Sequence, residues 1–216
     1  MGLIIHANTS DGYQASGLIS TWDATHDAVG FGSPTTSTTR TSTNGIRYEY
    51  VTGRASGHYL LRSFFDFDTS GITSTVASAT FSVKTYSQNS ATPIVVCKSG
   101  HDPSTTSDDW FSTWLTGQSI TLSDWSSGDV TAYSTSTAVA SDGVFTDITL
   151  NAAALSDLVS LSSFKICVLH ANDLADTAPA SITRTGFYYA DYFLSSSDPH
   201  IDYTLSTGYA NTVNGI

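Results

Sequence analysis

Acidic side chains that lie close together in the sequence are the residues of this chain most able to do chemistry. They form three pairs, Asp66/Asp68, Asp108/Asp109 and Asp173/Asp176. A glycosidase needs two carboxyl groups about 5 to 10 Å apart across a cleft, and closeness along the chain does not establish that geometry. The sequence contains no G-x-S-x-G, no P-loop, no G-x-G-x-x-G and no H-E-x-x-H. We therefore expect a protein without enzymatic activity.

Aromatic side chains are the second group with a possible role, because sugars stack on exposed Trp and Tyr rings. The candidates are Trp110, Trp114, Trp125, Tyr188, Tyr189 and Tyr192. Core packing is the expected role of rings of this kind. Trp110 and Trp114 have the most polar neighbours in the sequence, so they are the first candidates for exposure. Tyr188 and Tyr189 are the next candidates for a ligand-binding role.

The charge balance narrows the classes of partner. The 216 residues carry a net charge of −11, and only 12% of them are charged. Such a chain repels phosphate backbones and anionic lipid surfaces, so we expect no nucleic-acid binding and no membrane binding. Four of the five arginines fall in one short region, where they either pair with Glu49, Asp66 or Asp68 or form a local basic patch; they are Arg40, Arg47, Arg54 and Arg62.

The two cysteines, Cys97 and Cys167, each lie in an apolar run typical of a strand. Free buried thiols are the default interpretation, and a disulfide between the two strands is the alternative. Neither cysteine has the Cys or His spacing of a zinc site.

The elements that must position these residues are mostly strands. Residues 59–67 are dense in aromatic and aliphatic side chains, which predicts a strand buried on both faces or nearly so. Asp68 to Gly71 reads as a turn, and residues 76–86 alternate between apolar and polar, as in a strand with one wet face. Further strands are predicted over residues 3–7, 46–52, 94–98, 120–125, 132–139, 144–150, 164–170 and 200–205. Residues 181–194 contain an aromatic run, Phe187-Tyr188-Tyr189.

Helices are expected to be few and short. Asn151 can cap a helix over residues 152–158, and one helical turn is predicted near residues 21–28 with Ser20 or Thr21 as its cap. Long loops are predicted over residues 30–44 and 99–117. Many short strands without a sustained helical period indicate an all-β sandwich or jelly roll.

The order of these segments resembles that of the DNRLRE-type domains, which are similar to carbohydrate-binding modules. The resemblance rests on Arg-x-Phe-Phe-Asp-Phe-Asp followed by Ala-Ser-Ala-Thr-Phe-Ser-Val, and on weaker matches at residues 8–17, 145–155 and 198–205. It spans most of the chain. It implies a single jelly-roll β-sandwich domain over residues 1–206 with one or two short helices and long loops. Residues 207–216 would then form a C-terminal tail.

Jelly rolls of this kind often carry a structural calcium ion, so the resemblance also implies a possible calcium site. Asp11, Asp173 and Asp176 are the candidate ligands, since calcium prefers oxygen ligands. The alternative interpretation is that these carboxylates are solvated side chains of turns.

The resemblance implies a function as well, because such domains occur in structural proteins of tailed bacteriophages and in secreted bacterial proteins. We expect a bacteriophage virion structural protein, made in the host cytoplasm, that decorates the capsid or forms part of a head or tail fibre. It would contact other virion proteins, form a homo-oligomer, and contact host-surface glycan. The start of the chain has no signal-peptide pattern, which favours this interpretation over an extracellular carbohydrate-binding module of a secreted bacterial protein.

The tail has a possible role of its own in this interpretation. Its final residues resemble short segments near the C-termini of tailed-phage structural proteins, and they would dock onto another virion subunit; they are Val213, Asn214, Gly215 and Ile216. The alternative is a frayed terminus.

Overall fold

The computed structural model describes residues 2–27, 35–36, 45–53, 56–86, 92–100, 114–115, 125, 127–190 and 195–207. Its strands are β1 (Leu3–His6), β2 (Gly12–Ala15), β3 (Thr35–Thr36), β4 (Gly45–Val51), β5 (Gly57–Asp68), β6 (Val76–Tyr86), β7 (Pro93–Lys98), β8 (Thr137–Ala138), β9 (Phe145–Thr149), β10 (Ser163–His170), β11 (Thr183–Phe187) and β12 (His200–Leu205). The short helices are α1 (Trp22–His26), α3 (Ala152–Ser160), α4 (Ala171–Leu174) and the 3-10 turn η1 (Ser195–Ser197).

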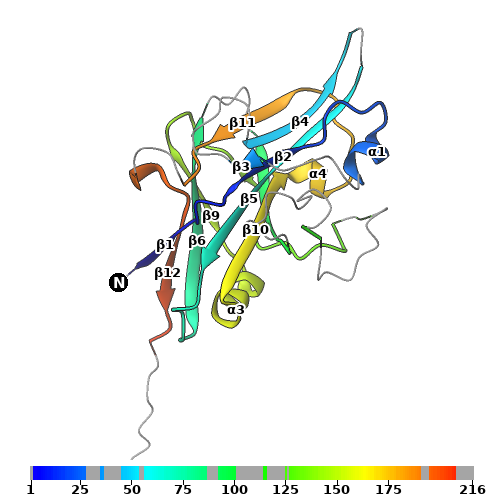
Figure 1. The fold of residues 1–216 in the computed structure, drawn as a ribbon. Helices are drawn as coiled ribbons and strands as arrows, with labels where there is room; N and C mark the ends of the chain where they lie inside the picture. The colour runs from blue at the N-terminus through cyan, green and yellow to red at the C-terminus, as the bar shows by residue number, and fades with distance from the viewer. Residues whose placement is uncertain are drawn as a thin grey trace, which may run out of the picture.

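The strands pair antiparallel throughout, in the order β1-β12-β6-β11-β4-β5-β10-β7-β8. β2 pairs with β5 and β3, and β9 pairs with β6, off this path. β6, β9 and β12 contribute to the same apolar core as β5, β7 and β10, so the two parts of the sheet pack face to face. The expected all-β sandwich with short helices is therefore confirmed (Figure 1).

β5 is the strand around which the fold is built, and it is buried on both faces as predicted. Phe65 and Phe67 enter the main core between the two parts of the sheet. Phe64 enters a second core on the opposite face, with Trp114 and Trp125. Residues on alternate positions of a strand point to opposite faces, so the apolar residues of this strand contribute to both cores.

β6 follows the predicted alternation, because Ala79, Phe81 and Val83 are buried in the main core. On the other face, Ser78 is exposed and its hydroxyl shares a hydrogen bond of 2.7 Å with that of Thr204.

The α3 helix is also as predicted. The Asn151 side chain accepts hydrogen bonds from the backbone N–H groups of Ala153 and Ala154, and these bonds satisfy donors at the start of the helix. α1 falls within the predicted helical turn, but Thr21 makes no side-chain cap bond.

Some predicted strands differ in extent. The strand predicted over residues 132–139 is reduced to β8 (Thr137–Ala138), and β11 (Thr183–Phe187) lies in the segment noted for its aromatic run. Most of the strand predicted over residues 120–125 lies outside the described residues. β2 was not predicted, because Gly12–Ala15 is short and lacks an apolar run.

The two cysteines lie directly opposite each other on β7 and β10, and both are free and buried. The interpretation of free buried thiols is therefore confirmed.

Candidate functional site

A buried ion pair between β5 and α4 anchors the most polar part of the interior. The Arg62 Nε donates to Asp173 Oδ2 and its Nη2 to Asp173 Oδ1, both at 2.8 Å. Neither side chain is more than 2% exposed. The guanidinium carbon also lies 5.5 Å from the Trp114 ring and 5.1 Å from the Trp125 ring, close enough for cation–π contact. A carboxylate held by both arms of an arginine has a fixed orientation, so this pair fixes α4 against β5.

His26 joins α1 to this pair. Its Nε2 lies 2.9 Å from the Asp173 carbonyl oxygen and its Nδ1 lies 2.7 Å from Asp27 Oδ1. Its ring stacks on Trp125, with the ring centroids 4.1 Å apart. Because His26 is buried, these contacts hold the five-residue α1 helix in place although the helix is too short to be stable alone.

Three rings outside this buried cluster reach solvent, and we call Trp22, Tyr50 and His58 the aromatic surface. The ring centroids of Trp22 and His58 are 5.7 Å apart, and those of His58 and Tyr50 are 5.0 Å apart. Trp22 and His58 are half-buried, whereas Tyr50 is 37% exposed. Trp22 is held by a hydrogen bond of 2.7 Å from its Nε1 to Asp176 Oδ1.

The residues beneath the aromatic surface form a rigid and uncharged floor. Tyr48 stacks on His170 with ring centroids 4.1 Å apart and the planes almost parallel, and its edge meets Trp22. The Tyr48 hydroxyl donates to the carbonyl of Thr177. Burial raises the pKa of Tyr48 to about 12 and lowers the pKa of His170 to about 4, so both rings are neutral near pH 7.

This arrangement can bind a ligand that has both apolar faces and hydroxyl groups. Rings such as Trp22 and Tyr50 offer flat apolar area at little cost in side-chain entropy. Asp176, whose side chain is 43% exposed, and the exposed Asp23 offer acceptors beside the rings. Stacking combined with carboxylate acceptors is the chemistry of sugar recognition.

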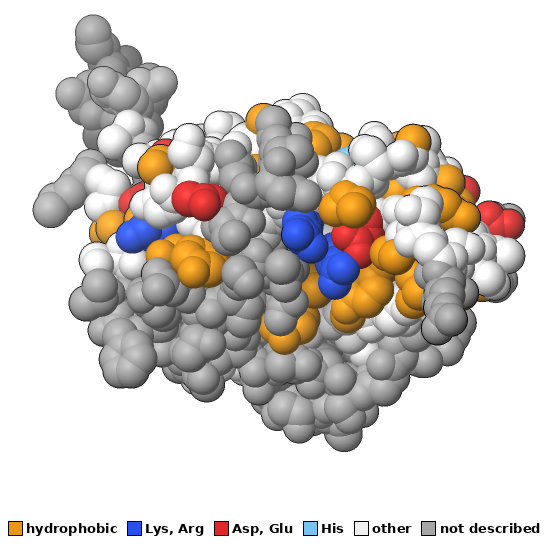
Figure 2. Space-filling view, turned by 90° about the horizontal axis from the view of Figure 1, so that it is seen from above, with side chains coloured by type: hydrophobic (Ala, Val, Ile, Leu, Met, Phe, Trp, Pro, Cys, Tyr) orange, Lys and Arg blue, Asp and Glu red, His pale blue; other side chains and the backbone are white. Residues whose placement is uncertain are grey.

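On the opposite face of the sheet, β4 and β11 each carry an arginine. Arg47 pairs with Glu49, as one interpretation of the arginine-rich region predicted, and its guanidinium lies 4.2 Å from the Tyr59 ring. Arg184 lies opposite Arg47 in the β4–β11 register. Viewed from the end where β4 and β11 lie, the described Lys and Arg side chains are interspersed with hydrophobic and acidic ones (Figure 2).

The predicted aromatic candidates that the structure describes do not lie together at the surface. Trp114 is fully buried beside Trp125 and Arg62, so the expectation that it would be exposed is wrong. Tyr189 is also fully buried, and its hydroxyl bonds to Ser63 in the interior. Tyr188 is 7% exposed and lies under Lys84 Nζ.

Several of the predicted residues fall outside the described part of the chain. They are Trp110 and Tyr192 among the aromatic candidates, Asp108 and Asp109 among the acidic pairs, Arg40 and Arg54 among the arginines, and Val213, Asn214, Gly215 and Ile216 in the tail.

The predicted calcium ligands do not fit a calcium ion. Both carboxylate oxygens of Asp173 accept from Arg62, and Asp176 accepts from Trp22. Asp11 is engaged elsewhere, where its Oδ2 accepts from the backbone N–H of Ala190. Among the described residues, no three His, Cys, Asp or Glu side chains are grouped so that they could hold a metal ion. The expected ligand loop is instead the α4 helix and the turn that follows it.

Sequence reasoning did not find the aromatic surface or the partner of Arg62. Arg62 was expected to pair with a nearby acid, whereas Asp173 is 111 positions away. Trp22 was assigned to a helical turn, but nothing local to it indicates that β4 and β5 would bring Tyr50 and His58 beside it. Asp176 has a backbone φ of +47°, and this turn directs its carboxylate to Trp22 only in the folded chain.

No protein-family model matches the chain, and no curated protein matches it. Within the part of the chain that the structure describes, no helix is long and apolar enough to cross a membrane.

Proposed function

We propose that this chain is a non-enzymatic structural component of a bacteriophage virion that binds a host-surface glycan through its aromatic surface. The observation that carries the binding part is the grouping of Trp22, Tyr50 and His58, whose neighbouring centroids are 5.7 and 5.0 Å apart at the surface of a rigid sheet. Side chains held in place before binding lose little entropy when a ligand arrives, which favours recognition of a flat sugar face.

The charge around the aromatic surface favours a neutral glycan. Asp23 and Asp176 flank Trp22, and the whole chain carries a net charge of −11. An anionic polysaccharide would be repelled by this field, whereas the hydroxyl groups of a neutral sugar can donate to the carboxylates.

The non-enzymatic part of the proposal is supported by how the described acidic groups are used. Asp173 neutralises Arg62 in the interior. Asp66 accepts from the Asn8 amide at 2.8 Å and from the Ser163 hydroxyl at 2.5 Å. These carboxylates hold elements together.

The virion part is supported by the sequence resemblance of residues 58–86 and by the all-β architecture, which agrees with what that resemblance implies. The first strand offers a place for subunit contact. β1 lies at one end of the strand order, and its Leu3 and Ile4 are 41% and 55% exposed. An apolar sheet edge of this kind is suited to pairing with a strand of another subunit in a symmetric oligomer or a capsid lattice.

Binding to immobilised neutral oligosaccharides tests the glycan part. We expect binding of the full chain to members of a panel of glucan, mannan, galactan and chitin oligomers, and a loss of about tenfold or more in Trp22→Ala and Tyr50→Ala, since each removes a stacking ring. Tyr50 is the more exposed of the two, so its replacement leaves the fold least disturbed.

Tyr59→Ala is the matched control, because Tyr59 is the neighbour of His58 on β5 but points to the opposite face. It should bind as the unchanged protein does. Binding that is the same in all three variants, or absent from the whole panel, would contradict the glycan proposal.

Mass spectrometry of peptides from purified virions tests the virion part. Hundreds of copies per particle would indicate a capsid decoration or head-fibre protein, and a few to a few dozen would indicate a tail or vertex component. Absence from the particle combined with glycan binding would instead support the second candidate, a carbohydrate-binding module of a secreted bacterial protein.

A further inference from the structure

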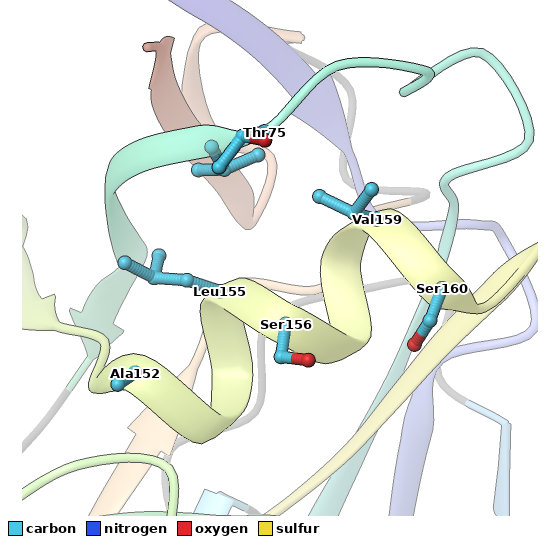
Figure 3. A pocket seen from close by; sticks show the side chains of 7 residues that line it. Thr75, Ala152, Leu155, Ser156, Val159 and Ser160 are labelled. Atoms are coloured by element: carbon cyan, nitrogen blue, oxygen red, sulfur yellow. The ribbon is translucent and has the colours of Figure 1, made fainter.

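A surface hollow lies between α3 and the start of β6, at the end of the molecule opposite the aromatic surface. It has a volume of about 510 Å³, and Leu155 and Val159 project into it from α3 on the side of Thr75 (Figure 3). A second hollow of about 340 Å³ shares Val159 and Ser160 with it and continues over the turn between β5 and β6. The two hollows meet at Val159 and Ser160, the last residues of α3, and together form a surface that we call the α3 groove.

The chemistry of this α3 groove limits its occupant. The described residues that line the first hollow offer aliphatic side chains and the hydroxyl groups of Thr75, Ser156 and Ser160, and none of these described residues is charged. Leu155 and Val159 are only partly buried by the core beneath them. An occupant that covers them gains apolar burial, and the hydroxyl groups can bond its backbone. The described lining offers no charged group to pair with a charged occupant, and the chain as a whole carries a net charge of −11. An occupant without charged side chains therefore fits the groove best.

The described chain ends beside the groove, at the end of β12. Leu205 pairs with Val76, and the backbone N–H of Ser206 donates to the Thr75 carbonyl at 2.8 Å. Thr75 and Val76 both line the groove, so the chain leaves the sheet at its edge. Residues 208–216 follow, with the sequence G-Y-A-N-T-V-N-G-I, and contain no charged side chain.

We propose that residues 208–216 occupy the α3 groove of their own chain, with Val213 and Ile216 against Leu155 and Val159. An extended segment of this length reaches about 30 Å, which exceeds the roughly 14 Å length of α3. Because it is attached at the edge of the groove, its effective concentration there is high, on the order of millimolar. The same segment from a second copy would have to compete with the attached segment, which is present at this effective concentration. The inference is independent of glycan binding, which concerns the opposite end of the molecule.

Hydrogen exchange of the α3 backbone amides tests this proposal on the full chain. Removal of residues 208–216 should speed exchange in α3 by about threefold or more, because the groove side of the helix loses its cover. Val213→Asp should reproduce that change, since it places a charge against an apolar lining. Asn211→Asp adds the same charge at a position that is not an anchor, and should exchange as the full chain does.

Variants of the groove give the reciprocal test without disturbing the core. Ser156 is exposed and lines the groove, so Ser156→Arg should fill it and abolish the effect of removing residues 208–216. Ala153 is exposed on the same helix but does not line the groove, so Ala153→Arg should leave that effect intact. Exchange in α3 that does not respond to removal of the segment would overturn the proposal. Protection that increases with protein concentration would overturn the same-chain assignment by showing a segment from a second copy.

Discussion

Arg62 on β5 and Asp173 on α4 meet inside the protein through two parallel hydrogen bonds of 2.8 Å, although 111 positions separate them in the sequence. The pair lies where three elements converge, since the Arg62 Nη2 also donates to the His26 carbonyl at the end of α1. A charge in such a position is tolerated because its partner is fixed beside it.

Asp173→Asn should therefore destabilise the protein strongly. The substitution removes the buried negative charge to which both arms of the Arg62 guanidinium are hydrogen-bonded, which costs about 3 to 5 kcal/mol in the free energy of unfolding. Urea denaturation followed by tryptophan fluorescence would measure the loss, because Trp114 and Trp125 flank the guanidinium.

Lys98→Met is the control, because it removes a partly exposed ion pair in place of a buried one. Lys98 Nζ also lies 2.8 Å from a carboxylate, that of Asp157, but these side chains are 34% and 22% exposed. Loss of a solvated pair should cost about 1 kcal/mol or less. Equal losses in the two variants would mean that burial does not distinguish the pairs.

The native thiols should resist chemical modification. Burial raises the pKa of Cys97 and of Cys167 far above the ordinary value of a thiol, and neither sulfur is accessible to solvent. The thiolate is the reactive form, so a disulfide-exchange reagent such as DTNB should label no cysteine in the folded protein at pH 8 and two after unfolding in urea.

An added surface cysteine, Ser141→Cys, verifies that the reagent is active, because Ser141 is exposed. This variant should react once while folded. Labelling of Cys97 or Cys167 at the rate of the added cysteine would contradict the structure.

The elements that sequence analysis predicted correctly are those whose pattern is local. The run at residues 59–67 carries the full signal of a strand with two buried faces, and residues 76–86 carry that of a strand with one. Asn151 directly before three alanines specifies the start of α3 in the same way.

The candidate site was missed because none of its relationships is local. The rings of Trp22 and His58 meet only because residue 19 pairs with β5 through an isolated bridge, Ile19↔His58, that no short-range pattern announces. The polar neighbours of Trp114 in the sequence suggested exposure, yet packing against Arg62 and Trp125 buries it. At both places the structure is decided by contacts between residues far apart in the sequence, which no local pattern reveals.

Gly57 is required where that bridge forms. A Cβ atom at this position would lie 2.4 Å from the Ile19 carbonyl oxygen and 2.9 Å from its carbonyl carbon, both backbone atoms. Gly57→Ala should therefore push residue 19 away from β5, lower the free energy of unfolding by about 1 to 3 kcal/mol, and weaken the proposed glycan binding by displacing Trp22.

Gly71→Ala is the matched substitution, since nothing lies within 4 Å of a Cβ there. It should change stability by less than about 0.5 kcal/mol, as surface substitutions usually do. Thermal unfolding of the two variants side by side measures the difference, and a Gly57→Ala protein as stable as Gly71→Ala would show that the close approach is absent.

The stability of the protein should fall as the pH drops from 6.5 to 4, and His170 should be a main cause. Burial lowers the pKa of His170 in the folded chain from its ordinary value of 6.5 to about 4, so the unfolded chain binds the proton first. The Nδ1 of His170 accepts a hydrogen bond from the backbone N–H of Asn172 at the start of α4, and only the neutral ring can do so.

Because the folded pKa is depressed, the contribution of His170 is fully present above pH 6.5 and is lost by pH 4, in total about 3 kcal/mol. His170→Asn keeps a capping acceptor without a titrating ring, so the variant should show a shallower fall in unfolding free energy over this range. His6→Asn, at an exposed position on β1, should leave the slope unchanged. Urea titrations at half-unit steps of pH measure all three proteins, and a slope in His170→Asn as steep as in the unchanged chain would assign the pH dependence to other groups.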